Sequence, residues 1–92
     1  MIVGSLRIRL LLREARSLKD KRQVVLSIKE RLRQRFNVSV AEIEAQDNRQ
    51  LAVLGIVMVS NEARHVRTAL QQIVEAVRRH PVAELLDHEL EV

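Results

Sequence analysis

The chain contains no cysteine, no tryptophan and no tyrosine, and its only aromatic residue is Phe36. The absence of cysteine excludes disulfide frameworks, thiolate zinc sites, CxxC redox chemistry and cysteine nucleophiles. It also favours a cytoplasmic location, because structural disulfides accumulate in oxidising compartments. The scarcity of aromatic side chains removes the groups on which many RNA-binding domains stack bases.

Long apolar runs and chain-breaking residues are also scarce. No stretch reaches the roughly 18 uninterrupted apolar residues that a membrane helix needs, and residues 1–5 lack the basic and apolar regions of a secretory signal. We therefore expect neither export nor membrane insertion. Two glycines and one proline leave little room for disordered linkers. Residues 1–92 are expected to form a single domain.

The first part of the chain has the pattern of a strand followed by a helix. Apolar residues alternate with other residues over residues 2–12, which predicts a half-buried strand with Arg7 and Arg9 on its outer face. Ser17 and Asp20 form a capping box, so a helix is expected from Leu18 to about Arg35. Its apolar stripe repeats about every 3.6 residues and consists of Leu18, Val25, Ile28, Leu32 and Phe36, with Val24 beside it.

Two further strands are expected in the middle of the chain. Residues 38–45 change the phase of their apolar positions, which indicates a strand with a bulge or bend. After a polar turn, residues 51–59 are apolar at every position, including Gly55, which predicts a strand covered on both faces.

A second helix and a last strand complete the pattern. Ser60 or Asn61 is expected to cap the helix, and His80-Pro81 to end it. In residues 86–92 apolar and acidic side chains alternate, which predicts a strand with one acidic face. The order β-α-β-β-α-β predicts an α+β, ferredoxin-like sandwich. Right-handed crossovers would place both helices on one face of a four-stranded antiparallel sheet in the order 4-1-3-2.

Positive charge is concentrated at the start of the chain. Residues 1–35 contain eleven arginines or lysines and three acids, a net of +8, whereas residues 36–92 carry a net of −4. Clustered cations attract anionic partners, although Asp20 and Glu30 could instead pair with cations on an ordinary solvated helix face. The candidate nucleic-acid-binding residues are Arg7, Arg9, Arg16, Lys19, Lys21, Arg22, Lys29 and Arg33.

These cations suggest a non-catalytic protein that binds structured RNA or a ribosomal particle through phosphate contacts. Two alternatives remain open: a homo-oligomeric interaction module that binds an acidic protein, and a small enzyme with a phosphate or small-molecule site at a subunit interface.

The expected third strand also suggests self-association. Because alternate residues point to opposite faces, one apolar set must leave the helix-packed core. An exposed apolar row on a central strand is typical of a contact surface, so we expect a homo-oligomer formed through the open sheet face. The candidate interface residues are Val53, Leu54, Ile56, Val57 and Met58.

No residue pattern predicts a catalytic, metal or cofactor site. Acylphosphatases share this fold and size but have a glycine-rich phosphate loop after the first strand, where this chain has residues 13–17, REARS. We expect a structural role for His80 at the helix end, where a cation would suit the helix dipole. Asp87, His88 and Glu89 alternate across a strand and cannot all reach one metal ion.

Several stretches resemble the bacterial YlxP-like family, a conserved domain of unknown function. The resemblance covers nearly the whole chain and is carried by residues 1–4, 14–22, 35–42 and 59–61. It implies a ferredoxin-like fold in a small cytoplasmic protein, often encoded near translation and ribosome-maturation factors. It implies no established activity and supplies no catalytic residues.

Overall fold

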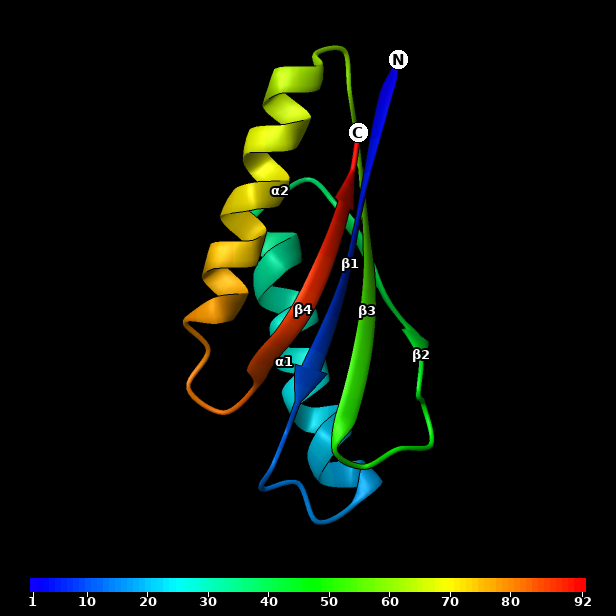
Figure 1. The fold of residues 1–92 in the computed structure, drawn as a ribbon, viewed down its shortest axis with the longest axis vertical. Coiled ribbons are helices and arrows are strands. Elements are labelled where there is room, and N and C mark those ends of the chain that lie inside the picture. The colour runs from blue at the N-terminus through cyan, green and yellow to red at the C-terminus, as the bar shows by residue number, and fades with distance from the viewer.

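Six elements follow one another in the computed structural model, which describes residues 1–92. The strands form one antiparallel sheet in the order β2-β3-β1-β4, and both helices cover the same face of that sheet (Figure 1). The predicted ferredoxin-like arrangement is confirmed, since 4-1-3-2 is this order read from the other edge. Neither helix is long and apolar enough to cross a membrane. The elements are β1 (Ile2–Leu11), α1 (Leu18–Arg35), β2 (Ser39–Glu44), β3 (Leu51–Ser60), α2 (Ala63–Arg78) and β4 (Glu84–Glu91).

The core lies between the two central strands and the helices. Leu6 pairs with Ile56 and Ile8 with Leu54 across β1 and β3, and all four side chains point toward the helices. They join the apolar stripes of α1 and α2 in one cluster of 20 buried residues. Burial of each larger aliphatic side chain in it contributes about 1.5–3 kcal/mol, so this cluster is the main stabilising feature of the fold.

The two helices cover different ends of the sheet, which makes the molecule elongated, 42 × 22 × 22 Å (Figure 1). α2 lies over the start of β1, so closely that a Cβ on Gly4 would overlap Val66. α1 lies over the other end, where its Lys21 reaches the Leu51 carbonyl. Glycine at position 4 is therefore required by the close approach of α2 to β1.

The two helix starts differ from each other. At α1, Ser17 Oγ accepts a hydrogen bond from the Asp20 amide at 3.1 Å, as predicted. The Asp20 carboxylate reaches back one residue further than a capping box requires and accepts from the Arg16 amide at 3.0 Å. At α2 the prediction of a Ser60 or Asn61 cap is wrong. β3 continues to Ser60, and the N-cap is Glu62, whose side chain makes no capping bond.

Both edge strands are irregular. β2 has the predicted bulge, between Glu42 and Glu44. β4 begins at Glu84, two residues earlier than predicted, and its pairing with β1 shifts at a second bulge. This bulge puts Leu85 in contact with the core and leaves Leu86 41% exposed, so the predicted alternation is interrupted at Leu86.

The expectation that β3 is covered on both faces is correct only for its first half. Val53 points away from the helices but is 2% exposed, flanked in the sheet by Arg9 of β1 and Glu44 of β2. Val57 and Val59 lie on the same open face and are about half exposed, at 45% and 51%.

This arrangement corrects part of the predicted oligomer interface. Leu54, Ile56 and Met58 belong to the helix-packed core and are unavailable for contact. Of the five residues predicted for the interface, only Val57 is exposed to solvent.

Candidate nucleic-acid interface

The two arginines of β1 are neutralised within the sheet. Arg7 donates two hydrogen bonds to Glu44 of β2, at 3.2 and 2.9 Å, and Arg9 donates one to Asp87 of β4 at 2.6 Å. The hydrogen-bonded carboxylate of Glu44 raises the pKa of Arg7 above its usual value, and the charges of Glu89 and Asp87 act in the same direction. These pairs remove Arg7 and Arg9 as free cations for a phosphate backbone.

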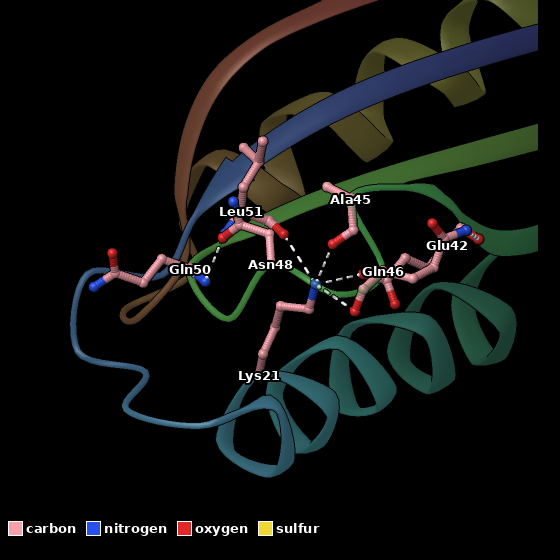
Figure 2. A network of polar contacts seen from close by, with 7 residues as sticks. All are labelled: Lys21, Glu42, Ala45, Gln46, Asn48, Gln50 and Leu51. Atoms are coloured by element: carbon pink, nitrogen blue, oxygen red, sulfur yellow. Dashed lines mark hydrogen bonds and ion pairs between the residues drawn. The ribbon is translucent and has the colours of Figure 1, made fainter.

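Lys21 is fully buried, which excludes it from any contact with nucleic acid in this fold. Its side chain extends from α1 and places the ammonium group in the turn between β2 and β3 (Figure 2). Nζ donates to the carbonyls of Ala45 at 2.8 Å and Leu51 at 3.0 Å, with a longer contact to Gln46 at 3.4 Å. Glu42 Oε2 lies 2.9 Å from Nζ and supplies the opposite charge, as an ion pair without hydrogen-bond geometry.

The position of Lys21 has a signal in the sequence. Lys21, Val25, Ile28 and Leu32 follow at spacings of four, three and four residues, so Lys21 continues the buried stripe of α1 toward its start. Ala45, one of its acceptors, has a positive φ of 59°, a conformation that costs a non-glycine residue about 1–2 kcal/mol. Lys21 therefore holds a strained turn, and its expected role in a nucleic-acid surface is replaced by a structural one.

The other five predicted cations reach the surface, four of them on one face of α1. Arg16, Lys19 and Arg22 are exposed, Lys29 is half-buried, and none of these four has a carboxylate within 4 Å. Arg33 Nη2 donates to the Val40 carbonyl of β2 at 2.8 Å, which places this flank of α1 beside the β2 edge. We call Lys19, Arg22, Lys29 and Arg33 the cation row. At 1.5 Å per residue it extends along about 21 Å of helix axis.

Charge is also separated between the helix layer and the sheet. α1 contains seven cations and two acids, and α2 with its C-cap residue Arg79 contains four cations and one acid, so this helix layer has a net charge of +8. The four strands contain two cations and six acids, a net of −4. The net charge of each half of the sequence does not reveal the cations of α2. A sum over each expected helix would have revealed them: Arg64, Arg67, Arg78 and Arg79.

His80 shapes the connection between α2 and β4. Its Nδ1 accepts hydrogen bonds from the amides of Val82 at 3.2 Å and Ala83 at 3.1 Å, which requires that nitrogen to be unprotonated. Burial lowers the pKa of His80, and the positive charge of Arg31 lowers it further. The structural role expected for His80 is thus that of a neutral acceptor, and the expectation of a dipole-compensating cation is wrong.

Comparison with solved structures gives the fold. A de novo designed protein with a ferredoxin fold, solved by solution NMR, superposes with a TM-score of 0.57 over 100% of this chain and 87% of that chain, at 11% identity. A second designed protein, Ferredog-Diesel, gives a TM-score of 0.53 over 99% of this chain and 85% of that chain, at 16% identity. At such low identity these likenesses establish the ferredoxin-like fold alone.

Sequence comparison gives the particular family. Residues 3–90 match the family described as "Protein of unknown function (DUF503)". The uncharacterized protein YlxP of Bacillus subtilis (strain 168) is 37% identical over 71 residues, which cover 77% of each chain. The chain belongs to the DUF503 family, in agreement with the resemblance found in the sequence.

Replacing Lys21 should destabilise the fold strongly. Lys21→Met leaves the Glu42 carboxylate buried without a counter-charge and removes the donor from the Ala45 and Leu51 carbonyls, so we expect the free energy of unfolding to fall by about 3–5 kcal/mol. Urea unfolding measures this. The exposed neighbour gives a matched control, because Lys19→Met should cost less than about 0.5 kcal/mol. Adding Glu42→Gln to Lys21→Met should recover part of the loss. If Lys21→Met lowered the free energy of unfolding as little as Lys19→Met, the structural role of Lys21 would be contradicted.

His80 should make stability depend on pH. Because its pKa in the folded chain lies below the ordinary 6.5, the unfolded chain takes up a proton first as the pH falls. The free energy of unfolding should therefore be highest above about pH 7 and decrease as the pH falls through 6.5. His80→Asn retains an acceptor near the Nδ1 position without this titration and should reduce the decrease. The exposed His65→Asn is the control. Parallel stability curves for wild type and His80→Asn would contradict this assignment.

Proposed function

We propose that this protein binds structured RNA, free or within a ribosomal particle, through the exposed surface of its helix layer. The observation that carries the proposal is the net charge of that layer, which is +8 in total and +7 without the buried Lys21. Within it the cation row presents Lys19, Arg22 and Lys29 without carboxylate partners. Cations that are not already paired attract phosphates most strongly, because binding then breaks no internal ion pair and releases condensed counterions from the nucleic acid.

The expected mode of binding is recognition of phosphates and shape. The chain's one aromatic ring, Phe36, lies under the guanidinium of Arg35, 5.2 Å from ring centroid to Cζ. No aromatic side chain is left to stack bases on the open sheet face, as many RNA-binding domains of related architecture do. Contacts to the sugar-phosphate backbone fix position and carry little sequence information. The protein would therefore act as an adaptor or chaperone-like component, without covalent chemistry.

A filter-binding titration against ribosomal RNA at several salt concentrations tests this function. Each phosphate contact contributes about −0.7 to −0.9 to the slope of log K against log salt concentration. Arg22→Ala with Lys29→Ala should weaken binding uniformly across RNAs and make the slope shallower by about 1.5.

Arg7→Ala with Arg9→Ala is the matched control, because it removes the same charge from the already paired sheet face. It should leave the slope unchanged once circular dichroism confirms folding. Equal losses in the two double variants would show that only total charge matters, and a salt-independent affinity would contradict the proposal. A protein partner that remains bound after nuclease treatment would instead favour the alternative of an acidic protein.

A second proposal concerns self-association through the open sheet face. Val3 and Val59 are cross-strand partners, Val57 lies two residues along β3, and Ile43 covers Gly55, so the four side chains form one apolar patch. Each is between 44% and 51% exposed. The neighbouring arginines are paired with carboxylates, so the patch lies on a face without free cations. Such a face fits a second copy of this chain better than it fits RNA.

Light scattering after size-exclusion chromatography tests this self-association. The wild-type chain should elute with at least the mass of a dimer at about ten micromolar, and Val57→Lys should convert it to a monomer with an unchanged circular dichroism spectrum, because the charge would have no partner at the centre of the interface. Val82→Lys, at a half-exposed valine outside the sheet, is the control and should keep the wild-type mass. A monomeric wild-type mass would remove the proposal.

A further inference from the structure

A cavity of about 400 Å³ lies between the C-terminal halves of the two helices. Its apolar lining comes from Ile28 and Leu32 of α1 and from Ala76 and Val77 of α2. Arg31 and Arg35 line it from α1, and Arg79 lines it from the end of α2. Its size is in the range of small-molecule sites, which typically combine an apolar lining with a few convergent polar groups.

The charge in this cavity is unbalanced. No acidic residue lines it, and none of its three arginines forms an ion pair. Both helices end here, and each C-terminus contributes a partial charge of about −0.5. One arginine would therefore offset the two helix dipoles, whereas three leave an excess of about two positive charges. Compensation of the dipoles explains part of this cluster but not all of it.

Two contacts orient the polar groups of the cavity. The guanidinium of Arg35 lies over the Phe36 ring at 5.2 Å. His80, which also lines the cavity, uses Nδ1 to accept from the amides of Val82 and Ala83. Nε2 is then the nitrogen that carries the proton, and it remains free to donate to an anion.

We propose that this interhelical cavity binds a phosphate monoester with a flat organic group, such as a nucleoside monophosphate. The phosphate would accept charge-assisted hydrogen bonds from Arg31 and Arg79, whose forked donors match phosphate geometry. The organic group would lie against the apolar lining, where Arg35 can stack on a planar ring. The same phosphate could belong to a free nucleotide or to the 5′ end of an RNA chain. The three arginines of this site belong to the same helix layer but lie outside the cation row, and binding of the monoester does not require that row.

A titration of the ¹⁵N-labelled protein with AMP, followed by NMR, tests the site. We expect saturable shifts of the amides of Arg31, Arg35, Arg79 and His80, and at least about tenfold weaker binding of adenosine, which lacks the phosphate. Arg31→Gln with Arg79→Gln should weaken AMP binding by at least about tenfold. The matched control is Arg64→Gln with Arg67→Gln, which removes equal charge elsewhere on α2 and should change the affinity less than about twofold. Wild-type-like spectra without ligand confirm that both variants are folded.

Two short RNAs, one with a 5′-phosphate and one with a 5′-hydroxyl, distinguish the sources of the phosphate. Binding that requires the 5′-phosphate and is lost in Arg31→Gln with Arg79→Gln, in the absence of AMP binding, would assign the site to an RNA terminus. Three results would overturn the proposal: no saturable binding of either monoester, equal weakening by the two double variants, or inorganic phosphate binding as tightly as AMP. None of these three results bears on salt-dependent RNA binding through Arg22 and Lys29. The two proposals can therefore fail separately.

Discussion

The buried ammonium group of Lys21 fixes the rotation of α1 together with the apolar stripe that it continues, and the character of two surfaces depends on that rotation. Lys21 joins the helix to the turn between β2 and β3 through two close carbonyl contacts and the Glu42 carboxylate. With Lys21 on the buried side, the cation row lies along the β2 edge, and Arg31 and Arg35 lie toward α2. The buried face of α1, which includes the charge of Lys21, thus determines which other charges reach the surface.

Pairing across strands decides which of the remaining cations stay free. Arg9 stands opposite Asp87 in the sheet register, and Arg7 reaches across β3 to Glu44. Such exposed pairs add little stability, typically below about 1 kcal/mol each. Their larger effect is on the surface, since they cancel the positive charge of the sheet while the helices retain theirs. Strand order and register therefore leave the sheet without free arginines, whereas the excess of acids in the strands comes from their sequence.

Features that depend on local sequence were predictable. The bounds of α1 follow from the Ser17 cap and the apolar stripe, and the alternation in β1 indicated its inward face correctly. Several features that depend on the register between distant segments were missed, although the strand order was predicted correctly. A bulge in the pairing with β1 places Leu85 against the core and leaves Leu86 exposed. Val53 is buried although it points away from the helices. The pairing of Arg7 with Glu44, 37 residues apart in sequence, likewise requires the register.

The same contrast between local signals and contacts of distant segments holds for Lys21 and the interhelical cavity. Lys21 lies four residues before Val25 on the buried stripe, which is a local signal for burial. Because lysine is charged, this signal is easy to overlook. The interhelical cavity is different, because Arg31 and Arg79 are far apart in the sequence and meet only through the staggered packing of α1 and α2. No local pattern indicates that meeting, whereas the excess of cations on both helices can be counted from the amino-acid sequence alone.

The two proposed surfaces are compatible because they lie on opposite faces of the sheet. A dimer formed through the open sheet face would direct its two helix layers outward, in opposite directions. One short RNA helix that lies on the outer surface of a helix layer would then contact only that layer, so dimerisation would add no phosphate contacts to that helix. An RNA long or folded enough to reach both layers would gain affinity through effective concentration. In that geometry self-association favours extended or folded RNA over short duplexes, a preference that arises from the fold without reading any base.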